Sequence, residues 1–321
     1  MAKISCSVLI MLLFVNGCIH VDLLSGGKTL QETTISGEGS EKVLLIDISG
    51  TLSTSQESGI FSEPSLPARL KEELTKAEND DQIQAIILRI NTPGGTVTSS
   101  DIVYHELQEF KRKRNLPIIT SIMDIGASGG YYIAMASDYI FAHPSTITGS
   151  IGVIMLTLNA EGFLEKVGLQ PAAIVSGPNK SMGSPFRAMK DEERAIFQDV
   201  IDQLYARFLE VVGEGRPNLS AEKIRTLADG RIYTADVAQA EGLIDEIGYL
   251  DDAIAQAKKH AKLGEAHVVT YTRRSPETHH NIYSQFEPPT VGPLGFPQIN
   301  AKTVLGALQS GGPHMMYIWM P

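Results

Sequence analysis

The sequence predicts an α/β fold built on a largely parallel β-sheet. Buried strand patterns alternate along the chain with amphipathic helix patterns of about a dozen residues, the length that a crossover between parallel strands needs. The chain has 321 residues, of which 43% are hydrophobic, and this is ample for one large or two ordinary domains. The formal net charge of −10 argues against a nucleic-acid-binding surface, since "KRKR" at 111–114 is an isolated basic run.

The first half of the chain supplies this alternation. "IQAIILRI" at 83–90 is a nearly continuous apolar run, which is typical of a strand buried on both faces. The other patterns predict, in chain order, a strand at 42–49, a helix at 66–80, a helix at 99–114, a strand at 116–124 and a short helix at 128–138.

The second half continues with strands within 139–155, a helix at 159–168 and a strand at 171–177. A long helix is expected at 191–212, and its apolar stripe predicts contact with the core or with another subunit. The stripe consists of Ile196, Val200, Leu204, Phe208 and Val211. The domain is completed by helical patterns at 221–230, 234–248 and 250–264 and by a strand at 266–272.

The N-terminal region differs in composition from this domain, which we place at 41–273. Residues 1–17 are typical of an export leader, because their apolar run is too short to span a bilayer comfortably. "VNGC" at 15–18 resembles a bacterial lipoprotein cleavage site, which would leave a lipidated Cys18 as a membrane anchor; an uncleaved N-terminal anchor is the alternative. Residues 18–40 are polar and rich in Gly, Ser and Thr, so we expect a tether that holds an exported domain at the membrane.

The C-terminal region, 274–321, is rich in proline and lacks periodicity, which predicts a tail outside the core. It ends in "HMMYIWMP", an apolar segment that we expect to dock on the folded domain. Both cysteines, Cys6 and Cys18, lie at the leader, so the folded domain has no thiol for a disulfide, a metal cluster or a nucleophile. No cofactor is expected.

Two glycine-rich stretches could carry chemistry. In "LRINTPGGTV" a buried strand runs into Gly94 and Gly95, whose amides could approach a ligand closely, although an ordinary turn would use the same residues. In "GASGG" Ser128 stands between a strand and a helix in the G-x-S-x-G pattern of an exposed nucleophile. Amides such as those of Gly94 and Gly129 are the donors from which an oxyanion hole is built.

A serine nucleophile needs a base, and the sequence offers two kinds. His260 and His267 follow Asp245 and Asp251, which is the chain order of a Ser-His-Asp triad in α/β-hydrolases. Lys180 is the other candidate, because it follows a strand pattern and lies among small and apolar residues instead of on an amphipathic helix. A lysine acts as a base only when it is neutral, a state that burial favours.

Five segments resemble, in order, the bacterial SppA family of signal peptide peptidases in its short form. They are "INTPGG" at 90–95, "ASGGYYIA" at 127–134, "ITGSIGVI" at 147–154, "SGPNKSMGSPFR" at 176–187 and "DGRIYTADVAQAEGLIDEIG" at 229–248. The resemblance implies a Ser-Lys peptidase with the ClpP/crotonase-like fold, in which ββα crossover units repeat and helices flank them. It also implies a membrane protein whose subunits join in a ring and hydrolyse signal peptides and other short or unfolded hydrophobic peptides.

By this resemblance Ser128 is the acylated nucleophile and Lys180 is the general base. Ser150, in "TGSIG", would orient the lysine amine, and the amides of Gly94 and Gly129 would form the oxyanion hole.

The resemblance has one departure at the expected site, since Thr92 stands where many relatives have serine. Two other functions remain open at this point. One is an esterase or lipase that uses the histidine triad, and the other is a non-enzymatic crotonase-like scaffold that binds peptides.

Overall fold

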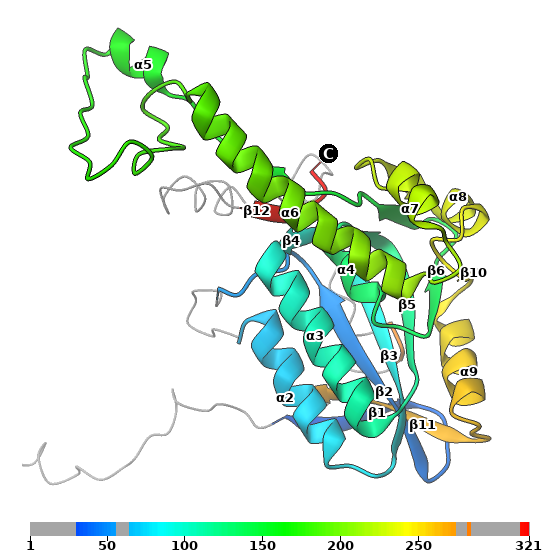
Figure 1. Cartoon of the computed structure of the whole chain (residues 1–321). Helices are drawn as coiled ribbons and strands as arrows, with labels where there is room; N and C mark the ends of the chain where they lie inside the picture. The colour runs from blue at the N-terminus through cyan, green and yellow to red at the C-terminus, as the bar shows by residue number, and fades with distance from the viewer. Residues whose placement is uncertain (1–29, 56–63, 274–280, 284–314, 321) are drawn as a thin grey trace, which may run out of the picture.

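The computed structural model describes residues 30–55, 64–273, 281–283 and 315–320 (Figure 1). The expected leader at 1–17 and the expected lipidation site Cys18 lie outside these residues, as does the tether up to residue 29. In the part described, no helix is both long and apolar enough to cross a bilayer.

A nine-stranded, mostly parallel β-sheet forms the centre of the described structure, as the alternation of strands and helices predicts. Its main path runs through β1 (Gln31–Ser36), β11 (Ala266–Thr272), β2 (Glu41–Ser49), β3 (Ile83–Thr92), β5 (Ile118–Ala127), β6 (Tyr139–Ala142) and β10 (Glu246–Ile247). All pairings on this path are parallel except that of β1 with β11. β7 (Ile147–Gly149) continues beside the end of β5 and pairs with β9 (Ile232–Thr234). The two glycine-rich motifs therefore meet at the carboxyl ends of β3 and β5.

Helices cover both faces of the sheet (Figure 1). The first face carries α2 (Leu66–Glu78), α3 (Val97–Arg114), α4 (Gly129–Ala134) and α6 (Asp191–Gly215), and the second carries α9 (Leu250–His260). The shorter helices are α5 (Glu161–Lys166), α7 (Ala221–Leu227) and α8 (Ala235–Ala240). Along β3, Leu88 and Ile90 belong to the first core while Ala85 and Ile87 belong to the second, which explains why this strand is apolar almost throughout.

The expected tether at 18–40 is wrong for its last part. Residues Gln31–Ser36 form β1, an edge strand that pairs antiparallel with β11. Threonine and isoleucine favour extended backbone, and an edge strand needs hydrogen bonds from one neighbour alone. The folded domain consequently begins near residue 31 and not at residue 41.

The expected strand at 171–177 is also wrong. This segment forms neither strand nor helix, and no described strand lies beside it to pair with its backbone. Ile174 is fully exposed and Val175 is 42% exposed. The apolar pattern that predicts a buried strand therefore lies on the surface of the single chain.

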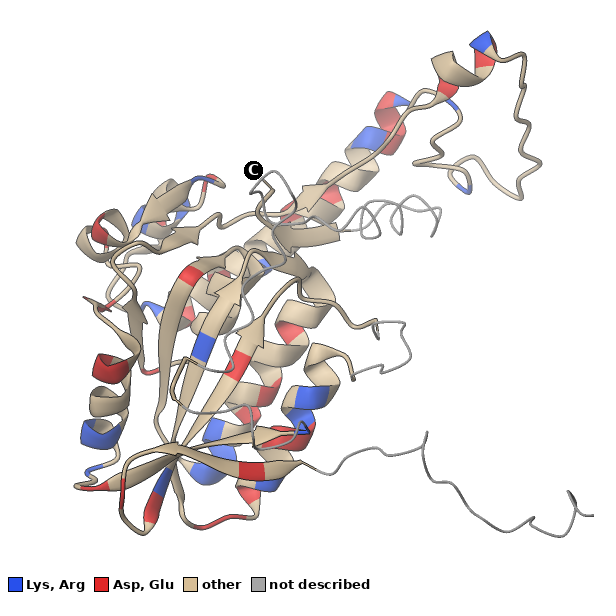
Figure 2. Ribbon diagram, turned by 180° about the vertical axis from the view of Figure 1, so that it is seen from behind, with Lys and Arg blue, Asp and Glu red and all other residues tan. Residues whose placement is uncertain are grey.

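The long helix α6 is buried mostly over its second half, although Glu193 and Phe197 of its first half are also buried. Phe208 and Val211 are fully buried, whereas Ile196 and Val200 are each 37% exposed. The first half of α6 projects from the body and carries α5 and its flanking loops at its outer end (Figure 1, Figure 2). We call residues 156–190 the arm.

A second sheet of three strands lies beside the carboxyl end of β3 and contains the end of the chain. Its strands are β4 (Gly94–Thr96), β12 (Met315–Ile318) and β8 (Ile154–Met155), with β12 in the middle and antiparallel to both neighbours. The expectation that the apolar end of the tail docks on the folded domain is confirmed.

Candidate active site

Ser128 is the single residue between β5 and α4. Its φ of 50° lies in the left-handed region, which residues other than glycine rarely adopt and which stores backbone strain. Its amide donates to the Gly149 carbonyl at 2.7 Å, and its carbonyl accepts from the Tyr132 amide at 2.9 Å. The serine therefore lies in the sharp, strained strand-to-helix turn that presents a nucleophile in hydrolases.

Gly94 and Gly129 lie against each other beside this turn. Gly94 has a φ of 100°, and a Cβ built on it would lie 2.7 Å from the Gly129 nitrogen, so a side chain would separate the two backbone stretches. The Gly94 amide donates to the Thr92 hydroxyl at 3.0 Å. An oxyanion at this amide would have to share the amide with the Thr92 hydroxyl or replace that hydroxyl. The threonine that departs from the family pattern therefore contacts an expected oxyanion donor directly.

Ser150 has a positive φ of 50°, the same value as that of Ser128. It follows Gly149, the residue whose carbonyl accepts from the Ser128 amide, and its own amide donates to the Arg231 carbonyl at 2.8 Å. Ser128 is 1% exposed and Ser150 is 8% exposed. The structure thus brings the two serines together at the ends of β5 and β7, in a site that solvent barely reaches.

Lys180 does not join these residues in the single chain. It lies in a turn of the arm, where its amide donates to the Gly177 carbonyl at 3.1 Å, and its side chain is exposed. The arm projects away from α4 (Figure 1). Within the described part of the chain, the Ser128 hydroxyl has no hydrogen-bond partner and therefore no base.

The histidine triad is wrong for this chain. His267 pairs with Lys42 near the start of β2, and the ring of His260 lies 5.9 Å from the ring of Tyr139 at the start of β6. These positions are the amino ends of parallel strands, whereas Ser128 is at a carboxyl end. Chain order alone is compatible with the triad. The direction of the strands excludes it, because it places both histidines at the opposite end of the sheet from Ser128.

Asn91 is a buried site residue that the sequence did not single out. Its side-chain oxygen accepts from the Ile125 amide at 3.1 Å, and its side-chain amide reaches Asp124 at 3.4 Å. These contacts tie the end of β3 to β5 three residues before Ser128. The sequence held one signal for it, a polar residue between the apolar strand and the glycines.

An aromatic cluster underlies the serine turn. Tyr132 of α4 contacts the rings of Tyr104, Phe208 and Tyr317. Its hydroxyl donates to the Asp101 carboxylate at 2.6 Å. Burial and this carboxylate raise the pKa of Tyr132, so its phenol is neutral and serves to fix α4 in place.

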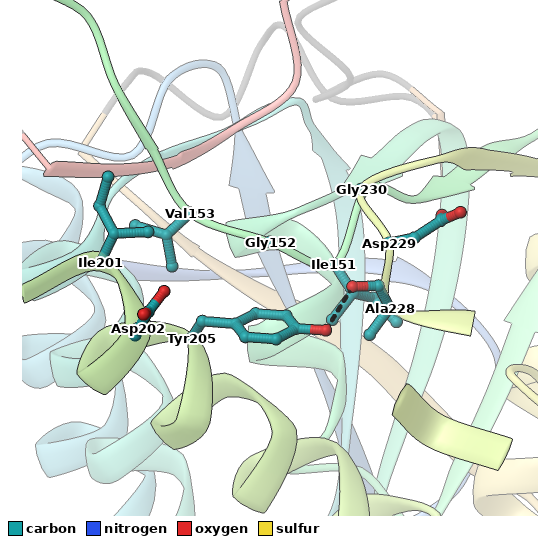
Figure 3. Close-up of a pocket in the computed structure, with 9 residues that line it drawn as sticks. All are labelled: Ile151, Gly152, Val153, Ile201, Asp202, Tyr205, Ala228, Asp229 and Gly230. Atoms are coloured by element: carbon teal, nitrogen blue, oxygen red, sulfur yellow. Dashed lines mark hydrogen bonds between the residues drawn. The ribbon is translucent and has the colours of Figure 1, made fainter. Parts of the chain in front are cut away.

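A pocket with a volume of about 320 Å³ opens beside Ser150 (Figure 3). Its lining consists of Ile151, Gly152 and Val153, of Ile201, Asp202 and Tyr205 from α6, and of Ala228, Asp229 and Gly230. The Tyr205 hydroxyl donates across it to the Ala228 carbonyl at 2.6 Å. The lining contains two carboxylates and no Lys, Arg or His. Among the described residues no group of His, Cys, Asp and Glu side chains could hold a metal ion.

Comparison with known proteins agrees with this geometry. The pattern of Peptidase family S49 matches residues 110–264, and that of the Clp proteases matches residues 61–148. A protein of Enterococcus faecium provisionally named signal peptide peptidase SppA is 38% identical over 242 residues, which cover 75% of this chain and 70% of that protein. Serine protease SPPA, chloroplastic, of Arabidopsis thaliana is 32% identical over 229 residues, and Protease 4 of Salmonella typhi is 35% identical over 199. This chain covers about a third of each of these two, 33% and 32%. The ClpP-like fold and the serine-peptidase assignment follow, and the chain belongs to peptidase family S49.

Proposed function

We propose that the protein is a membrane-associated serine endopeptidase that cleaves signal peptides and other short or unfolded hydrophobic peptides through an acyl-enzyme on Ser128. The observation that carries this proposal is the conformation of Ser128, a buried serine in the left-handed region at the carboxyl end of a parallel sheet, beside the amides of Gly94 and Gly129.

In the proposed reaction, neutral Lys180 takes the Ser128 hydroxyl proton as the oxygen attacks the peptide carbonyl carbon. The amides of Gly94 and Gly129 stabilise the oxyanion. Lys180 then returns the proton to the leaving amine as the carbon–nitrogen bond breaks. Water then attacks the resulting ester as Lys180 takes a proton from it, and Lys180 returns that proton to the Ser128 oxygen as the ester bond breaks and the acid product leaves. Ser150 hydrogen-bonds the lysine amine and keeps its lone pair directed at Ser128.

The base of each site comes from a second copy of the chain. One copy leaves Ser128 without a base and leaves Lys180 exposed on the arm. The arm also exposes a set of large apolar side chains, which in a soluble body marks a surface that another molecule covers. They are Leu156, Leu158, Phe163, Val167, Leu169, Ile174, Val175 and Phe186.

Charge favours the same arrangement. The arm carries Lys180 and Lys190, whereas the pocket beside Ser150 presents Asp202. Arg187 of the arm and Asp229 of the pocket are already paired with Glu193 and Arg231. A ring in which each arm lies over the Ser150 pocket of its neighbour would complete every site and cover the apolar surface.

The substrate class follows from the surroundings of the serine and from the termini. The serine turn lies against the apolar core, and β4 and β8 pair through their backbones with an extended segment, β12, as a bound peptide would require. Anchoring by a lipid on Cys18, or by an uncleaved leader, would hold the exported domain at a bacterial membrane, where cleaved signal peptides remain. The name of the Enterococcus faecium relative supports signal peptides as substrates.

Labelling of the full-length protein with a fluorophosphonate probe tests the mechanism. We expect Ser128→Ala and Lys180→Ala each to abolish labelling, and His260→Ala and His267→Ala to leave it at the wild-type rate. A lysine base predicts a rate that still rises above pH 8, whereas a histidine base would reach a plateau above about pH 7 to 8. A wild-type protein that neither labels nor hydrolyses peptides would be a binding scaffold instead.

A further inference from the structure

A buried carboxylate lies where the arm joins α6. No residue of the arm, 156–190, is buried, yet Glu193 in the first turn of α6 is 1% exposed. The Lys190 amide donates to Oε2 of Glu193 at 3.2 Å, which caps the start of the helix. The Arg187 guanidinium donates to both carboxylate oxygens, with Nη1 3.0 Å from Oε2. A carboxylate bonded in this two-pronged way is held in one orientation. We call Arg187 and Glu193 the clamp.

Arg187 connects this carboxylate to the turn that carries Lys180. Its guanidinium also donates to the Ser181 carbonyl at 2.8 Å and to the Ser181 hydroxyl at 3.1 Å. Ser181 directly follows Lys180, and its carbonyl accepts from the Ser184 amide at 3.3 Å, so the contact falls within the hydrogen-bonded turn. One planar guanidinium therefore joins the lysine turn to a helix whose other end is packed in the core.

The charges around the clamp keep both of its members ionised. The Arg187 guanidinium holds the pKa of the Glu193 carboxyl below its usual range, and the same hydrogen bonds raise the pKa of Arg187. Glu161 of α5 adds a negative charge near the guanidinium, and Lys190 adds a positive charge near the carboxylate. The contact between the arm and α6 is therefore present throughout the pH range in which a lysine base would be assayed.

We propose that Arg187 and Glu193 are positioning residues for the Lys180 base, since they fix the turn beside the lysine and so determine where its amine lies in the site that it completes. This inference rests on the peptidase function proposed above. Proton transfer needs the amine within about 3 Å of the Ser128 hydroxyl, and an exposed side chain on an irregular loop would otherwise spread over many positions. A displacement of about 1 Å can cost about 100-fold in rate.

Kinetics of the full-length protein test this role. Arg187→Met keeps the length of the side chain but removes every donor, and Glu193→Gln removes the charge at the other end of the clamp. Each should lower the rate of fluorophosphonate labelling and the kcat on a quenched hydrophobic peptide by about tenfold to 100-fold, with KM within about twofold of wild type. Arg187→Lys should not restore the rate, since an ammonium cannot bridge Ser181 and both carboxylate oxygens. Arg194→Met, at an exposed position next to Glu193, is the matched control and should behave as wild type.

Mixed assemblies show which half of the site the clamp serves. Arg187→Met mixed with Ser128→Ala should regain about a quarter of wild-type activity, because half of the sites keep the serine and half of these meet an intact arm. Arg187→Met mixed with Lys180→Ala should regain almost none, since no arm in that mixture carries both the clamp and the lysine. A substitution that damaged the serine half would instead recover with Lys180→Ala.

Hydrogen exchange measures the clamp without any catalysis. The amides of Lys180, Met182 and Ser184 donate to carbonyls within the turn. Arg187→Met should raise their exchange rates by about tenfold or more, whereas Arg194→Met should leave them unchanged.

Labelling of Arg187→Met and Glu193→Gln at the wild-type rate would overturn the proposal and leave the peptidase function standing. Unchanged exchange of the turn amides, or recovery with Lys180→Ala, would overturn it as well. If the wild type neither labels nor hydrolyses peptides, the peptidase function fails and the positioning role fails with it. Faster exchange in Arg187→Met would then show that the clamp serves the fold of the arm alone.

Discussion

Mixed assemblies of two inactive proteins should regain peptidase activity. Each chain carries its serine in the body and its lysine on the projecting arm, so a site between copies takes Ser128 from one chain and Lys180 from another. In a random one-to-one mixture of Ser128→Ala and Lys180→Ala chains, half of the sites keep the serine and half of these meet an intact lysine. We therefore expect about a quarter of wild-type activity, while each variant alone has almost none.

The assay is co-expression with two different affinity tags, purification over both, and hydrolysis of a quenched hydrophobic peptide. The control is a mixture of Ser128→Ala with Ser150→Ala chains. Ser128 and Ser150 meet within one chain through Gly149, so every site in this mixture lacks one of them and activity should stay low. An inactive Ser128→Ala and Lys180→Ala assembly that contains both chains would refute the lysine in trans, and so would recovery in the control.

Three further substitutions test the fold and the site. Burial raises the pKa of Glu73 from 4.5 to about 7, so between these pH values the native state holds a proton that the unfolded state releases. The free energy of unfolding should therefore fall by about 3 kcal/mol as the pH rises from about 4.5 to about 7. Urea titrations at several pH values should show Glu73→Gln flattening this slope; an unchanged slope contradicts the assignment. Gly94→Ala should lower kcat/KM by about 100-fold or more, because its Cβ meets backbone at the expected oxyanion hole. Gly50→Ala is the control and should leave kcat/KM unchanged, since Gly50 also has a positive φ, of 76°, but has open space around it. Equal effects of the two variants would exclude the oxyanion hole at Gly94. Arg89→Met removes a fully buried guanidinium that donates to Asp47 and should cost about 3 to 5 kcal/mol in urea unfolding, while a loss below 1 kcal/mol would show that this pair contributes little.

The elements that the sequence predicts correctly are those whose burial is decided locally. β3 reads as an apolar run because both of its faces are covered, and α3 reads as a helix because one face is covered. The sequence of β1 predicts a tether, because an edge strand with exposed side chains carries no apolar pattern. Its partner, β11, lies more than 200 residues away in the chain, so no local pattern predicts the pairing. The prediction of a strand at 171–177 is wrong for the opposite reason, since its apolar side chains are exposed and not packed against the described core.

The candidate site divides in the same way. Ser128, Gly94 and Gly129 lie on turns whose sequence requires small residues, and the parallel sheet brings those turns together. Lys180 could be recognised as unusual, but no sequence pattern states whether it acts in its own chain or, as we propose, in another copy. The contact of Thr92 with the Gly94 amide could not be predicted either, because it depends on a side-chain rotamer in a turn of positive φ.

The proposed function has one consequence for regulation. A single copy has a serine without a base, and its strand β12 lies between β4 and β8. If the base comes from another copy, a single copy should have almost no peptidase activity, and assembly should restore it.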